Sequence, residues 1–513
     1  MSTSLLAGLP ILTVLMLMLG LRWSAARAGT AGVVVAIVVA VAVFEFPSAL
    51  PVGGTAAAFG VASEAGFVAA TILWIIGPAL GIHHLQVRTG ATETLRLALQ
   101  RLSPDPRILA LLIAWFFALF MEGAAGFGTS VALAAPFLVG AGFKPMTAVS
   151  AAMIGHIVGV SFGAVGTPVV PQIAVTGLTG VELSRATALY HGLLGWLPLV
   201  VAMIVVVRGV PGARGRPVAT WLWTAGAAVS FLGPYMALAS WVGPELPTLG
   251  GALVGVVVFV LAVVVVGRRD RVAALEAPVA TEPPQSPSEL VRAASPYLVL
   301  VTLVLLTRLI GPLGEALRAV ELSWTLPGGF EGSVAPLYHP GTMLLAGFLA
   351  AAAIQRVSSA QLRATVEAAT RALAPVTVAL VAMLGLSRIM VHASMVDVLA
   401  VTAADLAGPT WPVFAALVGA LGTFITGSAT ASNILFTDFQ QATAQTLDLP
   451  VAPLVGVQGF GAAAGNAICP HNIIAASATV ALTGREGEVL RRTLGVALLY
   501  ALLGGLVAAV LVA

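Results

Sequence analysis

Long apolar stretches alternate with short polar segments along the whole chain. Each is about 17–25 residues long, enough to cross the hydrocarbon core of a bilayer as a helix. Arginines gather in the short segments between them, for example at 208–216 and 268–271. The pattern predicts an all-α, polytopic membrane protein. We expect 372–400 to form one long span and 311–339 to form an external loop.

Two of the apolar stretches are interrupted by glycines and polar residues. The first interruption is Glu122 with the glycines that follow it, and the second is Thr426–Asn433. Glycine weakens a helix, and a carboxylate at membrane depth is costly unless it has a partner. We therefore expect two broken helices that line a polar cavity. They would be re-entrant helical hairpins near 122–142 and 427–449.

The two interruptions belong to an internal repeat. Gly123 and Gly180 are separated by the same distance along the chain as Gly427 and Gly484. Basic residues around Arg107 precede the first interruption, whereas no basic cluster precedes the second. The positive-inside rule therefore places the two units in opposite orientations. Inverted-topology repeats of this kind are typical of secondary transporters with a binding site near the membrane midplane.

This organisation divides the chain into six parts. They are N-terminal spans with an interfacial helix (1–107), a first repeat core with its hairpin (108–208), a helix pair (217–267), a cytoplasmic linker (268–294), second-half spans (295–400) and a second repeat core with its hairpin (408–513). Arginine placement predicts that both termini lie outside the cytoplasm, in a protein of the inner membrane. By analogy with other paired-hairpin carriers, we expect an elevator-like scaffold and transport domain; the same analogy suggests a homodimer.

Composition and charge narrow the class of protein. Charged residues make up 9% of the chain and apolar residues 59%, which is far from a soluble composition. The net charge of +3 comes from arginines in short loops, so we expect no nucleic-acid partner. Cys469 is the only cysteine, and the acids and histidines show no metal-ligand spacing. We expect no cofactor and no enzymatic activity, because the hydroxyls near Gly427 lack a recognisable base.

Several motifs, in order along residues 108–513, resemble the lactate permease family. They are Glu122-Gly-Ala-Ala-Gly-Phe-Gly128, Gly142-Phe-Lys-Pro145, Phe162-Gly-Ala-Val-Gly166, Gly243-Pro-Glu-Leu-Pro247, Ser387-Arg-Ile-Met390 and Thr426–Asn433. The resemblance implies proton-coupled uptake of lactate, glycolate or a similar 2-hydroxymonocarboxylate. The chain departs from the family pattern at Ala429, His156 and His471-Asn472, in or beside the expected site. A sodium-coupled carboxylate carrier and an anion channel are the alternatives.

A carboxylate substrate requires positive potential at the interruptions. The free N–H groups at a helix N-terminus supply about half a charge, so 126–129 and 427–430 are candidate binding segments. The alternative is that these small residues only allow close helix packing. Arg388 could bind the carboxylate in a bidentate manner or serve as counter-ion to Glu122 or Asp397. The substrate-binding candidates are Gly126, Gly128, Thr129, Gly427, Ser428, Thr430, Ser432, Asn433, Arg388 and Asn472.

Proton coupling requires a titratable group at the same depth. The candidates are Glu122, His471, His156 and Asp438. Histidine titrates nearest to neutral pH, although a lone histidine in an apolar span is more often a simple helix contact. We expect Glu122 and Arg388 to interact. A substrate carboxylate arriving at Arg388 would then release Glu122 to take up a proton.

Overall fold

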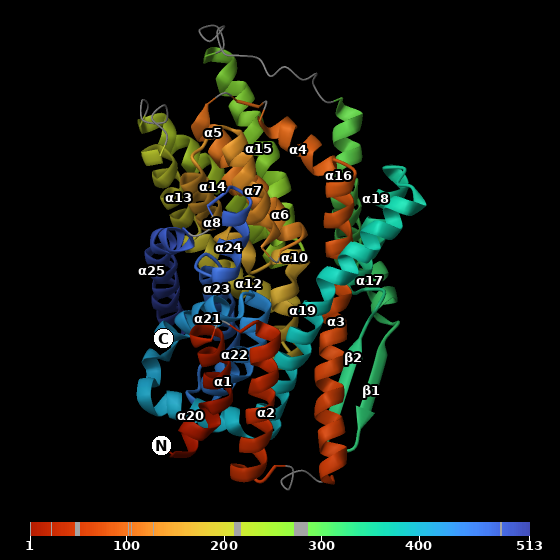
Figure 1. Cartoon of the computed structure of the whole chain (residues 1–513), viewed down its shortest axis with the longest axis vertical. Coiled ribbons are helices and arrows are strands. Elements are labelled where there is room, and N and C mark those ends of the chain that lie inside the picture. Colours follow the sequence, from red (N-terminus) through yellow and green to blue (C-terminus); the bar gives the residue numbers. More distant parts are fainter. Residues whose placement is uncertain are drawn as a thin grey trace.

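A computed structural model of the chain describes residues 2–21, 23–46, 52–100, 102–103, 105–126, 128–209, 217–270, 286–482 and 485–512. Within these ranges, eleven helices are long and apolar enough to cross a membrane, or up to twelve if a bent pair counts as one span. Figure 1 shows them running roughly along one long axis. The predicted class of polytopic helical membrane protein is confirmed. Part of the predicted linker, 271–285, lies outside the described residues.

The first half of the chain is helical throughout its described part. Its elements are α1 (Ser2–Gly20), α2 (Ala25–Val43), α3 (Gly54–Arg88), α4 (Ala91–Gln100), α5 (Pro106–Ala110), the π-helix η1 (Leu111–Phe117), α6 (Ala118–Ala124), α7 (Thr129–Gly140), α8 (Pro145–Gly155), α9 (Ile157–Val160), α10 (Gly163–Gly166), the 3-10 helix η2 (Thr167–Val169), α11 (Val170–Thr176), α12 (Gly180–Leu194), α13 (Trp196–Gly209), α14 (Pro217–Trp241) and α15 (Pro247–Asp270).

The second half contains the two strands of the described chain. Its elements are α16 (Pro287–Leu309), α17 (Gly311–Arg318), β1 (Leu322–Leu326), β2 (Phe330–Val334), α18 (Pro340–Ile354), α19 (Ser359–His392), α20 (Met395–Ala407), the 3-10 helix η5 (Gly408–Thr410), α21 (Trp411–Thr426), α22 (Ala429–Thr446), α23 (Val451–Asn466), α24 (Pro470–Ala478) and α25 (Glu486–Val512).

Capping boxes fix where three of these helices begin. In each, the N-cap hydroxyl accepts a hydrogen bond from the backbone of the third helical residue, whose side chain accepts one from the N-cap backbone. The pairs are Thr179 with Glu182, Ser286 with Glu289 and Ser358 with Gln361. Local sequence therefore sets the starts of α12, α16 and α19 before tertiary packing acts.

The repeat extends beyond the two hairpins. A helix of 35 residues, α3, precedes the first hairpin, and a helix of 34 residues, α19, precedes the second. The short helices α4 and α20 follow them, and α4 lies near the upper end of the molecule whereas α20 lies near its lower end (Figure 1). The long helices α3 and α19 pack against each other. The two units therefore run in opposite directions, as the charge pattern predicts.

Each sequence interruption forms the tip of a helix–turn–helix. The first hairpin has the segment Pro106–Ala124 as its first leg and α7 as its second, and the other hairpin consists of α21 and α22. The legs of each hairpin pack against each other. The expected ranges, 122–142 and 427–449, therefore cover the tip and second leg but omit most or all of the first leg. Re-entry from one side of a bilayer stays a prediction.

Two of the predicted segments differ in the structure, and one pair of helices is bent. The stretch 372–400 is not one span, because α19 ends at His392 and Ser394 takes a left-handed conformation with a φ of 55°. A bend of 42° separates α12 from α13. The predicted loop 311–339 contains α17 and an antiparallel β-hairpin that runs beside α3 (Figure 1). Phe330 of this hairpin is buried against Gly60 of α3, which explains why the segment is ordered.

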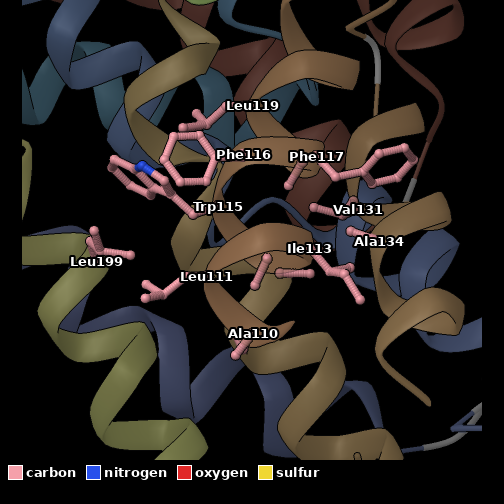
Figure 2. Packing of buried hydrophobic residues seen from close by; sticks show 14 of the residues in the cluster. Ala110, Leu111, Ile113, Trp115, Phe116, Phe117, Leu119, Val131, Ala134 and Leu199 are labelled. Atoms are coloured by element: carbon pink, nitrogen blue, oxygen red, sulfur yellow. The ribbon is translucent and has the colours of Figure 1, made fainter. Parts of the chain in front are cut away.

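The first hairpin is enclosed by protein. Of the span Pro106–Ala124, 94% is buried, compared with 33% of the C-terminal span Glu486–Val512. Figure 2 shows the aromatic side chains of η1, Trp115, Phe116 and Phe117, within one cluster that includes Val131 of α7 and Leu199 of α13. Irregular backbone is tolerated at membrane depth only where protein or water surrounds it. Enclosure by apolar packing therefore allows the hairpin to carry a broken tip.

Candidate functional site

The two hairpin tips meet at one small cavity. Five predicted site residues line it: Glu122, Gly126, Gly427, Ser428 and Thr430. The rest of the lining comes from 160–168, from Ala429 and from Asn466 at the end of α23. The cavity volume is about 30 Å³, enough for one or two molecules of the size of water. A larger molecule does not fit into the cavity in this conformation.

The first tip places an acid beside the cavity. The Glu122 side chain is almost fully buried, and Ser130 Oγ donates a hydrogen bond to its Oε2 at 2.6 Å. The turn between them closes locally, because Thr129 Oγ1 donates to the carbonyl of Gly126 at 2.6 Å. Gly128 has a φ of 79°, a left-handed conformation that favours glycine. The hydroxyl of Thr129 thus holds the turn together.

The second tip places a helix N-terminus beside the cavity. Gly427 ends α21 with a φ of 79°, and Ser428 caps α22 by accepting a hydrogen bond from the N–H of Ala431 at 3.4 Å. Ser428, Ala429 and Thr430 all line the cavity. The first N–H groups of a helix have no partner within it and carry partial positive charge. This end of α22 is therefore suited to an anion.

A strained segment forms another wall. Ala164 and Val165 are left-handed, with φ values of 43° and 55°. Valine is branched at Cβ, so this conformation costs roughly 1–3 kcal/mol and persists only where the surroundings impose it. A Cβ on Gly163 would lie 2.6 Å from Glu122 Oε1, and one on Gly166 would lie 2.5 Å from the carbonyl oxygen of Pro244. Close packing on both sides explains the motif Phe162–Gly166.

An amide that sequence reasoning missed connects three helices beside the cavity. Asn466 Oδ1 lies 2.8 Å from His156 Nε2, and Asn472 Nδ2 donates to the same oxygen at 2.6 Å. Asn472 also lies against the first tip, because a Cβ on Gly128 would be 2.5 Å from its Oδ1. A polar residue ending a run of small apolar residues was the signal in the sequence.

Ser432, Asn433 and His471 do not line the cavity. Ser432 Oγ donates to the Gly419 carbonyl, and Asn433 Nδ2 donates to the Pro168 carbonyl, each at 2.8 Å. Both side chains are buried and hold α22 against its neighbours. His471 is exposed beside Gly427, at the edge of the second tip.

The predicted contact between Glu122 and Arg388 is wrong. Arg388 Nη2 on α19 lies 2.6 Å from Asp438 Oδ2 on α22, and Ser387 Oγ donates to the same oxygen at 2.8 Å. The reason is the length of α22. Asp438 lies ten residues after Ser428, so it is about 15 Å along the helix from the tip, where α22 packs against α19.

Inverted repeats with two broken helices that meet at a buried polar cavity define a polytopic membrane protein with the architecture of a secondary transporter. The family model for L-lactate permease matches residues 3–327 and 329–513, and the chain belongs to this family. The resemblance seen in the motifs is thereby confirmed.

The curated relatives align over most of their length. The putative L-lactate permease of Haemophilus influenzae is 29% identical over 472 residues, covering 86% of this chain and 87% of the relative. The glycolate permease GlcA of Escherichia coli is 28% identical, covering 98% and 95%. Among solved structures, MtrF of Neisseria gonorrhoeae superposes on this chain with a TM-score of 0.51 at 13% sequence identity. The superposition covers 97% of this chain and 97% of MtrF. This last similarity shows the fold alone.

Proposed function

We propose that this protein carries a small 2-hydroxymonocarboxylate, lactate or glycolate, across the cytoplasmic membrane together with a proton. The observation that carries the proposal is the meeting of an acid, Glu122, and a helix N-terminus, that of α22, at one buried cavity. The names of the relatives, L-lactate and glycolate permeases, supply the substrate class.

The anion is held by partial charges and hydroxyls in this proposal. Neither lysine nor arginine is among the described residues that line the cavity. The N–H groups at the start of α22, with the hydroxyls of Ser428 and Thr430, therefore bind the carboxylate. Such binding is reversible, because a helix terminus attracts an anion by a fraction of a full charge. A carrier needs this property in order to release its substrate.

Glu122 is the first choice for the coupled proton. Its hydrogen-bond partner is the hydroxyl of Ser130, which can donate to a carboxylate or accept from a carboxylic acid. One proton taken up with one anion keeps the charge of the closed site unchanged. Asp438 is a weaker choice because Arg388 holds it as an ion pair, and His471 lies at the cavity edge.

Transport requires the tips to separate, since the cavity is too small for the substrate. The helices α2, α3 and α19 share one hydrophobic cluster with part of α22, whereas most of the first hairpin belongs to another. We expect the first group to act as a scaffold along which the first hairpin moves. The homodimer and the external position of both termini remain predictions.

Transport in proteoliposomes tests the proposal. The purified protein would be reconstituted and assayed for exchange of labelled L-lactate and glycolate at equal pH, then for accumulation driven separately by a pH gradient and a sodium gradient. We expect exchange of both acids and accumulation only with the pH gradient. Accumulation with sodium alone identifies a sodium-coupled carrier, and flux without counterflow identifies an anion channel. Either result rejects proton symport.

A further inference from the structure

A histidine and two asparagines form a buried hydrogen-bonded chain beside the cavity. His156 joins α8 to α9, Asn466 ends α23, and Asn472 lies in the first turn of α24. The relative exposures of these residues are 0%, 6% and 1%. The three helices come from both repeats, so the chain links the first repeat to the second directly at the substrate cavity.

Both ring nitrogens of His156 face oxygen atoms. Nδ1 lies 3.0 Å from the carbonyl oxygen of Ala152, and Nε2 lies 2.8 Å from Asn466 Oδ1. A neutral imidazole has one donor and one acceptor, whereas the protonated ring has two donors. The observed arrangement, with an oxygen atom at each ring nitrogen, therefore suits the protonated ring. When Nε2 loses its proton, Asn466 must turn its NH2 group toward the ring.

The orientation of the Asn466 amide determines whether a hydrogen-bond donor or an acceptor faces the cavity. Asn466 lines the cavity, and its Oδ1 is occupied by His156 and Asn472. Within the described part of the chain, its Nδ2 makes no hydrogen bond. With the histidine protonated, the NH2 group is therefore left to donate to a carboxylate. With the histidine neutral, the NH2 group faces the ring and Oδ1 turns away from it. An amide oxygen directed at the cavity disfavours an anion.

Rotation of the Asn466 amide also changes the group that faces the first hairpin tip. Two NH2 groups cannot hydrogen-bond to each other, so Asn472 must also turn when Asn466 does. In the observed state, Asn472 Oδ1 is buried without a partner and lies against Gly128. After the turn, this oxygen accepts from Asn466 and the Asn472 NH2 group faces Gly128. Protonation of His156 is thus transmitted to a residue of the moving tip.

We infer that Asn466 is the positioning residue that couples protonation of His156 to binding of the substrate carboxylate. The inference rests on the proposed function, because it assigns a mechanism to proton–anion coupling at the same cavity. Protonated His156 makes the site a donor site, and neutral His156 makes it an acceptor site. The substrate anion and the proton therefore stabilise each other on the protein, as reciprocal linkage requires.

The test is the pH dependence of substrate binding, measured with labelled L-lactate on purified protein between about pH 5 and 8, where histidine titrates. In the unmodified protein we expect the affinity to fall as pH rises, because protonation of Glu122 and of His156 both favour binding of the anion. Asn466→Leu removes both polar atoms at nearly constant size. We expect weaker binding and a shallower pH slope, because only the contribution of Glu122 remains.

A second variant and a control distinguish a loss of coupling from a loss of folding. In its ionised form Asn466→Asp can only accept, so it holds Nε2 protonated and gives weak binding with the same shallower pH slope. Gln458→Met removes a buried amide from the same helix α23, away from the cavity, and should retain the pH slope. A well-folded Asn466 variant with the slope of the unmodified protein overturns the inference but leaves the proposed symport standing. Absence of binding of both L-lactate and glycolate by the unmodified protein overturns both.

Discussion

Two acids of this protein lie in opposite settings. Glu122 is buried, borders the cavity and accepts a hydrogen bond from the hydroxyl of Ser130, whereas the partly buried Asp438 forms an ion pair with Arg388 between α22 and α19. A carboxyl group beside a hydroxyl can change its protonation without leaving another charge unpaired. Protonation of Asp438 would leave the partly buried Arg388 guanidinium without its partner, which is costly. The neighbours of each acid thus suit Glu122 to proton exchange and Asp438 to attachment of the second hairpin to α19.

The largest expected effect is loss of coupling in Glu122→Gln. This change keeps the shape and removes the titratable proton. We expect no accumulation of L-lactate driven by a pH gradient, while exchange at equal pH is partly retained. The measurement is uptake in proteoliposomes with and without the gradient. Asp438→Asn is the matched change at the other acid and should leave gradient-driven accumulation detectable. If Glu122→Gln still concentrates substrate, the acid is structural and His156 becomes the leading candidate.

The second prediction concerns stability at the other acid. Arg388→Met or Asp438→Asn leaves one member of the partly buried pair uncompensated and should lower the free energy of unfolding by about 2 kcal/mol, between the values for exposed and buried pairs. Arg388→Met combined with Asp438→Leu should recover most of this loss. Thermal denaturation in detergent measures both changes. Unchanged stability of Arg388→Met together with lost substrate binding would instead assign Arg388 to the substrate.

The third prediction distinguishes the hydroxyls at the start of α22 that face the cavity from a hydroxyl of the same helix that does not. Ser428 and Thr430 line the cavity, whereas Ser432 Oγ donates to the Gly419 carbonyl within the hairpin. Ser428→Ala with Thr430→Ala should weaken L-lactate binding by about 1–3 kcal/mol, because hydrogen bonds to a charged group are lost. Ser432→Ala should leave the affinity nearly unchanged. An equal effect of all three hydroxyls on the affinity would mean that packing of α22, and not contact with substrate, is responsible.

The smallest expected effect is a loss of stability that serves as a reference for the other variants. Ser358 caps α19, the helix that carries Arg388, at the end far from the ion pair. Ser358→Ala should lower the free energy of unfolding by about 1 kcal/mol, a typical value for an N-cap. Exchange and accumulation should not change. A transport defect in this variant would show that small losses of stability in α19 are enough to impair transport, and would weaken any functional conclusion from Arg388→Met.

The sequence alone determined the class, the repeat and the breaks. Hydrophobicity over about 20 residues is a local property, because a membrane helix satisfies its own backbone hydrogen bonds. Glycines and polar residues inside such a stretch mark a break for the same reason, and both hairpin tips fall at the predicted positions. Arginine placement gave the opposite orientation of the two units. The family motifs then pointed to L-lactate permeases.

Only the tertiary structure decided which polar groups meet. The partner of Arg388 depends on how far Asp438 lies along α22 and on which face of that helix meets α19. The chain from His156 through Asn466 to Asn472 joins residues far apart in sequence, so no spacing rule could predict it. The strained backbone at Ala164 and Val165 is likewise imposed by packing. Local sequence fixes where a helix breaks, whereas a buried polar contact is fixed by the packing of distant helices, because each group must find its partner across the fold.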